Sequence, residues 1–556
     1  MCGFVVGSKK QYNINESLQL IKHRGPDALQ LLETDDLIFG FARLSIIDLE
    51  TRSNQPFQKD NKLIMTFNGE IYNYLEIKNQ LINSGISFDT TGDTEVVYES
   101  FKFWGVDCFR KFEGMFAVVL YDSISRELII ARDQLGIKPI YFARRNNDDL
   151  LIASELKVFM HNGYNRVRRE AIKDYLCYGI HFAENTLIQD VNEVKPGSYT
   201  RIKIKGSVES KEYFNLKDTF VLNKSSDYDE IFDSLDRSIR LHTQADVEIG
   251  LQASGGLDSS IILANIHKHS KGFKSFSVNV MHSLLSEEYW QNELHKLYPH
   301  LNNTVSYHQA EGLNFKQDWV ESTYYHDLPL HHPNIIPSDA MNAVAKSQGL
   351  KVLLSGDGAD EIFCGYPWYR DSTYDLSSSA WIPFDYFEEV FNDFPSYFDI
   401  EEIKYGMEKE NIQTYFDQRF YIQKWFHRQD RSGMRNNIEI RVPFATKSLV
   451  ELVNPISTDM KTLGGSQPKQ YLKKYAEAYF PENFIYRNKV GFSIPINDWY
   501  SNVLFSQELI DILKEFNLFN VKIRTMINQG PCDKHSGRML WSLLSFAIWV
   551  QRFELK

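Results

Sequence analysis

Hydrophobic and polar residues alternate over short stretches in the first two hundred residues of the chain. Apolar, β-branched and aromatic residues fill these stretches, and Asn, Gly and Asp bound them, which predicts β-strands separated by turns. The predicted strands cover residues 37–48, 62–73, 115–122, 127–133 and 139–145. Helical spacing of apolar residues is found here chiefly at 74–85 and 94–105. We therefore expect a mixed sheet with helices packed on its faces.

The pattern changes after residue 207. A polar stretch at 222–229 precedes a long amphipathic helical pattern at 231–242, and this change predicts a domain boundary. Beyond it, helical segments alternate with apolar strands, which is typical of a doubly wound parallel sheet. These strands are predicted at 247–253, 273–280 and 350–356. The final third, rich in Tyr, Phe and Trp, is predicted to be mostly helical.

Composition narrows the class of protein. The chain has 556 residues, of which 43 % are hydrophobic and 24 % charged, as in a soluble globular protein of about two to four domains. Its formal net charge of −12 leaves no overall basic field, so we expect no nucleic-acid partner. Five scattered cysteines without a CxxC pair indicate reduced thiols and a cytoplasmic protein. The sequence has neither a long apolar run nor a signal-peptide pattern, so we expect no membrane association.

A cysteine stands at position 2. If Met1 is removed, Cys2 carries a free α-amine beside its thiol. That amine has an ordinary pKa of about 8 and can take the proton of a thiol whose ordinary pKa is about 8.5. Cys2 is then a candidate nucleophile with its base on the same residue. The alternative is a cysteine without a catalytic role, and the residue alone does not separate the two.

The stretch SGGLDSS, residues 254–260, joins a predicted strand to a predicted helix. Its small and hydroxyl residues are Ser254, Gly255, Gly256, Ser259 and Ser260. Such residues let the backbone approach a ligand closely at a helix N-terminus, where free N–H groups favour phosphate. Asp258 would repel a phosphate unless a cation lay between them, so it implies Mg²⁺. The alternative is a glycine turn that only caps a helix.

A second predicted strand ends in the loop SGDGADE, residues 355–361. Its glycines and Ser355 are joined there by the carboxylates of Asp357, Asp360 and Glu361. Because parallel strands end at one edge of their sheet, this loop and SGGLDSS should face one crevice. A cluster of carboxylates in that crevice needs a metal ion or protons to be tolerable. The alternative is a solvated acidic turn.

Two lysines follow further along the chain. Lys469 stands at the start of a predicted helix, and Lys489 stands just before a Gly-Phe turn. Each alone is an ordinary surface lysine. Beside the predicted crevice, both become candidate partners for a polyphosphate or for an anionic transition state.

Motifs along nearly the whole chain resemble, in order, those of the glutamine-dependent asparagine synthetase family. They are the N-terminal Cys2, HRGPD (23–27), RLSIID (43–48), NGEIYN (68–73), GDTEV (92–96), EGMFA (113–117), ARDQLGIKPIYF (131–142), ASELK (153–157), SGGLDSS, SGDGADEIF, EIRVPF (439–444), RNKVGF (487–492) and HSGRMLWSLL (535–544). The resemblance implies an N-terminal nucleophile αββα sandwich, an α+β glutaminase domain, at residues 1–210. It also implies an ATP-dependent synthetase domain at 225–556, an α/β doubly wound parallel sheet with added helices.

For the glutaminase, the resemblance implies that Cys2 attacks the side-chain amide of glutamine. The matching catalytic residues are Cys2, Asn68 and Gly69, the last two for the oxyanion hole. The matching glutamine-binding residues are Arg43 for the carboxylate, Asn68, and Glu70 with Asp93 for the α-amine. These residue types suit the task, because an anionic intermediate needs amide donors and an amino acid zwitterion needs one cation and one or two carboxylates.

For the synthetase, the resemblance implies that ATP activates an acceptor carboxylate as an acyl-adenylate, which ammonia from glutamine converts to an amide. The residues that match the ATP site are Leu251, Ser254, Gly255, Gly256, Asp258, Ser259, Ser260, Val278, Ser355 and Gly356. Asp258 and Asp360 match ligands of Mg²⁺. The further catalytic matches are Asp357, near the reacting acyl group, and Lys489, which stabilises charge. ATP and Mg²⁺ are the expected cofactors, and the oligomeric state stays open, with a homodimer among the options.

Three departures from the asparagine-forming pattern leave the acceptor open. Asp357 stands where Glu is common, Ala445-Thr446 where Leu-Asp is usual, and Cys364 where Gly is common. Aspartate is the leading acceptor, and the alternative is the same chemistry on another carboxylate, such as a sugar acid or a cell-wall or natural-product intermediate. An adenylating cyclase or a nucleotide-binding regulator is a third hypothesis. Intact Cys2, Asn68 and Arg43 disfavour it, because neither protein needs a working glutaminase.

Overall fold

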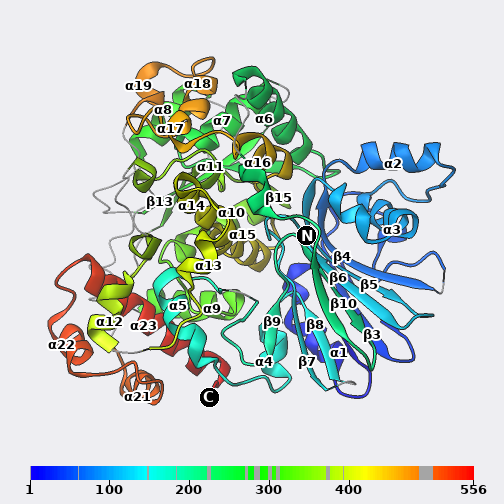
Figure 1. Ribbon diagram of the computed structural model, residues 1–556, viewed down its shortest axis with the longest axis horizontal. Helices are drawn as coiled ribbons and strands as arrows, with labels where there is room; N and C mark the ends of the chain where they lie inside the picture. Colours follow the sequence, from blue (N-terminus) through cyan, green and yellow to red (C-terminus); the bar gives the residue numbers. More distant parts are fainter. Residues whose placement is uncertain are drawn as a thin grey trace.

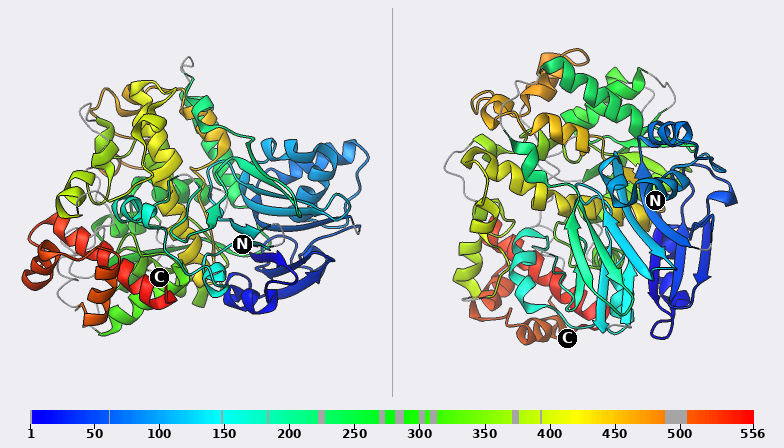
Figure 2. Two further views of the ribbon diagram at one scale, coloured as in Figure 1. Left: turned by 60° about the horizontal axis from the view of Figure 1, so that its bottom comes forward. Right: turned by 45° about the vertical axis from the view of Figure 1, so that its right-hand side comes forward.

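The computed structural model divides the chain into a sheet-rich half and a helix-rich half that lie side by side (Figure 1). It describes residues 2–60, 62–146, 149–182, 184–221, 227–268, 273–280, 288–298, 304–307, 313–370, 376–391, 394–487 and 505–556. The two further views of Figure 2 show the same arrangement, with the blue to cyan strands on one side and the yellow to red helices on the other.

The first half is built from two antiparallel sheets. One has the strand order β2 (Ala28–Glu33), β3 (Leu37–Arg43), β1 (Gly3–Ser8), β8 (Asp149–Ala153), β7 (Tyr141–Asn146) and β9 (Val191–Glu193). The other has the order β11 (Val208–Glu212), β10 (Ser198–Lys203), β6 (Glu127–Arg132), β5 (Gly114–Asp122) and β4 (Leu63–Ile71). The alternation in the sequence predicts a mixed sheet, but the strands divide between two sheets, in which neighbours such as β5 and β6 pair antiparallel.

Apolar side chains of both sheets meet in one layer, among them Phe4, Phe41 and Val119. Alternate residues of the strands face outward and are covered by helices. Helix α1 (Ile14–Leu20) packs on β1 and β3, whereas α2 (Tyr74–Asn83) and α3 (Asp93–Trp104) share an apolar cluster with β4. The layers are therefore helix, sheet, sheet and helix, which confirms the αββα sandwich.

The second half contains a parallel sheet in the order β14 (Thr304–Tyr307), β13 (Lys274–Val280), β12 (Ile249–Gln252), β15 (Val352–Leu354) and β16 (Glu439–Arg441). The chain reaches β13 and β14 on one side of β12, and β15 and β16 on the other. The sheet is therefore doubly wound, as predicted. The direction in which successive strands are added to the sheet reverses between β12 and β15. Open α/β sheets bind ligands at such a switch point.

Helices surround this sheet and fill most of the final third, as predicted. They include α6 (Tyr228–His242), α7 (Leu257–His267), α8 (Glu288–Leu297), α9 (Leu313–His326), α10 (Ile335–Ser347), α11 (Ala359–Ile362), α12 (Phe384–Phe391), α13 (Ile400–Lys404), α14 (Ile412–Phe416), α15 (Ile422–Arg435), α16 (Lys447–Val453), α17 (Thr458–Thr462), α18 (Gln470–Ala476), α19 (Glu482–Ile485), α21 (Gln507–Glu515), α22 (Val521–Gln529) and α23 (Lys534–Phe553). In the part of the chain that the structure describes, no helix is long and apolar enough to cross a membrane. The five cysteines are free thiols.

The two halves are interlocked. After α4 (Lys157–His161), helix α5 (Ile172–Tyr178) leaves the sandwich and packs against α12 and α23 of the second half (Figure 1). The last residue, Lys556, exchanges backbone hydrogen bonds of 2.8 Å with Asn165 and Val167. The predicted limits 1–210 and 225–556 stay a prediction, because the chain crosses between the halves before residue 210.

Candidate functional site

Cys2 lies buried at the start of β1, beside β4 of the facing sheet. Its backbone nitrogen donates to Asn68 Oδ1 at 2.9 Å, and its Sγ lies 3.9 Å from the carbonyl oxygen of Leu44. Burial raises the pKa of the Cys2 thiol, so this cysteine needs a base to become a nucleophile at neutral pH.

Asn68 and Gly69 have the features of an anion-stabilising pair. Asn68 Nδ2 is buried and has no hydrogen-bond partner among the residues that the structure describes. An unsatisfied buried donor costs roughly 1–3 kcal/mol, so an unpaired amide beside a thiol indicates a ligand site. Gly69 lies so close to β5 that a Cβ atom would come 2.1 Å from the carbonyl oxygen of Met115. Only glycine fits at this position.

The carboxylates of Glu70 and Asp93 are buried next to this pair. Asp93 begins α3, and its Oδ2 accepts from the N–H of Ile71 at 2.9 Å. Burial raises the pKa of Asp93 to about 6, and burial with the charges of Glu439 and Asp93 raises the pKa of Glu70 well above its ordinary range. Arg43, at the end of β3, donates to the carbonyl oxygens of Asp48 and Glu50. The structure thus brings together Cys2 and the predicted glutamine-binding residues.

Three further charged residues of this site carry no assigned role in the sequence analysis. Arg24 Nε donates to the carbonyl oxygen of Cys2 at 3.0 Å, and its guanidinium pairs with Asp430 at 2.7 Å. Glu439 and Arg441 enter from β16 of the second half, and Arg441 Nη2 lies 3.4 Å from Glu70 Oε1. Their motifs, HRGPD and EIRVPF, are visible in the sequence. Their contacts between the halves join residues hundreds of positions apart, so spacing alone could not reveal them.

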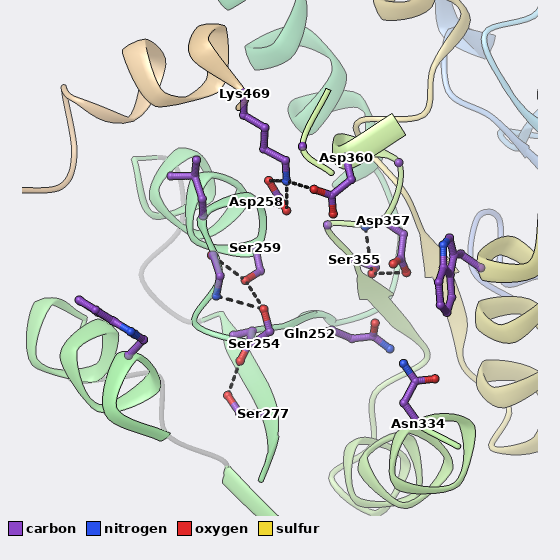
Figure 3. A pocket seen from close by; sticks show the side chains of 18 of the residues that line it. Gln252, Ser254, Asp258, Ser259, Ser277, Asn334, Ser355, Asp357, Asp360 and Lys469 are labelled. Atoms are coloured by element: carbon purple, nitrogen blue, oxygen red, sulfur yellow. Dashed lines mark hydrogen bonds and ion pairs between the residues drawn. The ribbon is translucent and has the colours of Figure 1, made fainter. Parts of the chain in front are cut away.

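The loops SGGLDSS and SGDGADE lie together at the carboxyl ends of β12 and β15. These strands pair parallel, with Leu251 opposite Leu354. A Cβ atom on Gly356 would come 2.9 Å from Asp258 Cβ, so the loops touch. A cavity of about 410 Å³ opens between them (Figure 3), and Ser254, Asp258 and Asp357 are among its lining residues. The crevice predicted from the two loops is present.

Most of the predicted nucleotide-binding residues line this cavity. They are Ser254, Gly256, Asp258, Ser259, Val278, Ser355 and Gly356. Three described residues do not line it. Leu251 is fully buried in β12, Ser260 Oγ donates to the carbonyl oxygen of Gly256 at 2.7 Å, and Gly255 has a φ of +81° that favours glycine. Lys489 lies outside the described residues.

Lys469 lies between the two predicted metal ligands. Its Nζ is 2.6 Å from both carboxylate oxygens of Asp258 and 2.7 Å from Asp360 Oδ1 (Figure 3). Burial opposes its protonation, but these two charges raise the pKa of Lys469 above its ordinary value. The two carboxylates therefore converge on one position that suits a cation.

Asp357 faces the same cavity from the other side. Its carboxylate pairs with Arg428 Nη2 at 3.1 Å and accepts from Ser355 Oγ at 3.0 Å. Gln429 also donates to Asp357 and, at 3.1 Å, to Ser355 Oγ. Burial and the charge of Asp360 raise the pKa of Glu361, another lining residue, to about 8. Asp357 is thus held by two residues of α15, and Glu361 holds its proton more strongly than an ordinary carboxyl group.

The two sites are connected through α15. Asp430, which pairs with Arg24 next to Cys2, directly follows Gln429, which donates to Asp357. The arrangement therefore places a candidate nucleophilic thiol and a nucleotide-sized cavity in one contact network.

Comparison with known proteins identifies relatives of both halves. A family model described as glutamine amidotransferase domain matches residues 1–214, and one described as asparagine synthase matches residues 230–551. Asparagine synthetase [glutamine-hydrolyzing] 1 of Bacillus subtilis (strain 168) is 28% identical, over 99% of this chain and 96% of that protein. Amidase chry2 of Gibberella zeae is 30% identical, over 67% of this chain and 59% of that protein. A solved glutamine phosphoribosylpyrophosphate amidotransferase from B. subtilis is 16% identical with a TM-score of 0.30, and the match covers 51% of this chain and 67% of that structure.

Proposed function

Because the chain belongs to the asparagine synthase family of glutamine-dependent ligases, we propose that it converts an ATP-activated carboxylate to an amide with ammonia from glutamine. Aspartate is the acceptor we propose first, with asparagine as the product. The observation that carries the proposal is the buried Cys2 thiol beside the unpaired amide of Asn68, in one contact network with the nucleotide-sized cavity.

The first half is proposed to hydrolyse glutamine. After removal of Met1, the α-amine of Cys2 takes the thiol proton, and the thiolate attacks the side-chain amide carbon of glutamine. Asn68 Nδ2 and the Gly69 N–H donate to the oxyanion of the intermediate. The C–N bond breaks, the amine returns its proton to the leaving nitrogen, and ammonia departs. Water then hydrolyses the thioester to glutamate and the free thiol.

Glutamine is proposed to be held by its charged ends. Arg43 meets its carboxylate, while Glu70 and Asp93 meet its ammonium. The loop at 48–54 keeps Arg43 in place, because its carbonyl oxygens and Asn54 Oδ1 accept from the guanidinium. A glutamine analogue without the α-amine should therefore bind poorly.

The second half is proposed to activate the acceptor in the cavity. An oxygen of the acceptor carboxylate attacks the α-phosphorus of ATP, and pyrophosphate leaves. Ammonia then attacks the acyl carbon, and AMP leaves with the bonding electron pair. Ser254, Ser259 and Lys469 are proposed to hold the phosphates, and Lys489 to stabilise charge during these steps.

Asp258 and Asp360 fit a Mg²⁺ ion that the nucleotide also ligates. Their carboxylates converge on the position now taken by Lys469 Nζ. Mg²⁺ in nucleotide enzymes is held by one or two carboxylates plus substrate phosphates, and it neutralises phosphate charge. Within the described ranges, no group of three or more His, Cys, Asp or Glu could hold a metal without such help.

A different acceptor is the second candidate. Asp357 is one methylene shorter than the Glu common at this position, and Arg428 and Gln429 already engage its carboxylate. One methylene moves a carboxylate by more than about 1 Å, which matters at a reacting centre. The amidase relative named above also supports an acceptor other than aspartate.

The test is pyrophosphate release by the purified protein with ATP, glutamine and Mg²⁺, with and without aspartate, followed by mass spectrometry of the product. A product with the mass of asparagine supports the first acceptor. Pyrophosphate release that appears only with other carboxylates from a panel supports the second candidate, a different acceptor. If neither occurs, the proposed reaction is wrong.

A matched pair of cysteine variants tests the nucleophile. Cys2→Ala should abolish glutamine hydrolysis yet retain synthesis with added ammonium salt. Cys108→Ala removes a buried free thiol away from the site and should retain both activities. Glutamine hydrolysis by Cys2→Ala would overturn the assignment.

A further inference from the structure

We propose that the synthetase half completes the glutamine site, and that Arg441 of β16 is the positioning residue that orients Glu70 for the ammonium of glutamine. The inference rests on the proposed function, because it takes Glu70 as the residue that binds the α-amine. Arg441 touches no reacting atom and acts through Glu70.

The side chain of Arg441 is fully buried and held at several points. Its Nη1 donates to the carbonyl oxygens of His242 at 2.9 Å and Gln244 at 2.7 Å, and its Nε donates to Glu439 Oε1 at 2.6 Å. Nη2 then lies 3.4 Å from Glu70 Oε1 and has no hydrogen bond of its own among the described residues. The guanidinium is therefore fixed in place, with the N–H groups of Nη2 left for Glu70.

The backbone of Arg441 belongs to the other active site. Its carbonyl oxygen accepts from the N–H of Ser355 at 2.8 Å, and its Cα pairs with Leu354 across β15 and β16. Ser355 begins the loop that carries Asp357. One residue thus fixes the acceptor loop with its main chain and the glutamine site with its side chain.

A second contact from the same half reaches the carboxylate end of the glutamine site. Asp246 Oδ2 accepts from the N–H of Asp48 at 2.8 Å, and the N–H of Asp246 donates to the carbonyl oxygen of Ile46 at 2.9 Å. The carbonyl oxygen of Asp48 in turn accepts from Arg43. The segment between His242 and Asp246 therefore contacts the residues that support both ends of the glutamine site.

Charge balance explains why an arginine is needed there. Glu70, Asp93 and Glu439 are three buried carboxylates in one cluster, and the guanidinium of Arg441 is shared between two of them. Buried like charges repel strongly in a low dielectric. Arg441 lowers the pKa of Glu70 against the opposing effect of burial and fixes its position, and the ammonium of glutamine supplies the further positive charge on binding.

The test compares glutamine hydrolysis by the full-length wild type with that by Arg441→Met and Arg441→Lys. Arg441→Met removes the charge at similar length, so Glu70 is no longer held in place for the ammonium of glutamine. KM for glutamine should rise by at least about tenfold, the usual loss when a hydrogen bond between charged groups is broken. Its kcat should fall by less than KM rises. Arg441→Lys keeps the charge but cannot make all four contacts, so its KM should lie between those of the other two.

Two controls separate positioning from damage to the fold. Synthesis with added ammonium salt needs the second half but no glutamine, and all variants should retain it within about threefold. Arg435→Met breaks a comparable ion pair with Asp339, of 2.7 Å, away from the glutamine site and should leave KM for glutamine unchanged. An equal loss of kcat in both reactions, with KM unchanged, would overturn the inference. Absence of glutamine hydrolysis in the wild type would instead overturn the proposed function.

The pH dependence of kcat/KM for glutamine hydrolysis distinguishes the two roles, because a purely structural role of Arg441 would not change it. Among the described residues, the titratable and charged groups that face Glu70 are Glu439, Asp93, Arg441, Tyr72 and Tyr74. Because the charge of Arg441 lowers the pKa of both Glu70 and Asp93, its removal should shift the acidic limb of kcat/KM to higher pH. An acidic limb at the same pH in wild type and Arg441→Met would contradict the proposed role.

Discussion

Glutamine should bind more weakly as the pH falls from 7 to 5. Burial raises the pKa of Asp93 to about 6, so this carboxylate gains a proton in this range, and the pKa of the neighbouring Glu70 is raised as well. A protonated carboxyl group cannot pair with the ammonium of glutamine, whereas glutamine itself keeps its charges between these pH values. The bound state therefore releases protons, and by linkage the affinity decreases as the pH decreases.

The magnitude follows from the pKa of Asp93. A group of pKa about 6 is roughly nine-tenths ionised at pH 7 and one-tenth ionised at pH 5, so the Kd should rise about tenfold. The measurement is isothermal titration calorimetry on Cys2→Ala, which binds glutamine without consuming it. Buffers of different ionisation enthalpy should also reveal proton release near pH 6.

The control is the same titration with Cys2→Ala and Asp93→Asn combined. This variant should bind about tenfold more weakly at pH 7 and lose most of the pH dependence, because one titrating group is gone. A Kd that stays within twofold from pH 7 to pH 5 in Cys2→Ala would refute the assignment of these carboxylates to the ammonium.

Three further predictions concern other residues. Asn68→Ala should lower kcat for glutamine hydrolysis by about 10²–10³ with little change in KM, as expected for an oxyanion donor, and glutamate production measures it; a larger effect on KM would contradict this role. Lys469→Met should reduce ATP-dependent pyrophosphate release by at least about tenfold and spare glutamine hydrolysis, whereas equal loss of both would indicate a damaged fold. Arg24→Met should lower the free energy of unfolding by about 3 kcal/mol in chemical denaturation, because it leaves the buried carboxylates of Asp430 and Glu155 with fewer cations, and a change below about 1 kcal/mol would oppose this.

The cavity of the second half could be predicted from the sequence because its parts are local. A buried strand followed by SGGLDSS or SGDGADE determines its own turn, and parallel strands bring such turns to one edge. The same local logic does not say which way each side chain faces. Leu251 and Gln252 are neighbours on β12, yet Gln252 lines the cavity and Leu251 lies in the core, because side chains alternate along a strand.

The glutamine site was predictable only through its first-half residues. Cys2, Asn68 and Asp93 lie in motifs whose residue types suit the chemistry. Glu439 and Arg441 reach the site from a strand that follows more than four hundred residues of chain, so their contact depends on how the two halves dock. The one mixed sheet expected from the alternation is likewise two sheets, because alternation determines which face is buried but not which strands pair.

The buried ion pairs between the halves have a consequence for recombination and engineering. Arg24 with Asp430 and Arg441 with Glu70 each join one charge from the first half to an opposite charge from the second. A chimaera that grafts the second half of a relative onto this first half would bury any charge whose counterpart is missing, at a cost of several kcal/mol per ion. The halves are therefore not interchangeable modules, and a new acceptor specificity should be sought by substitutions within the cavity rather than by exchange of domains.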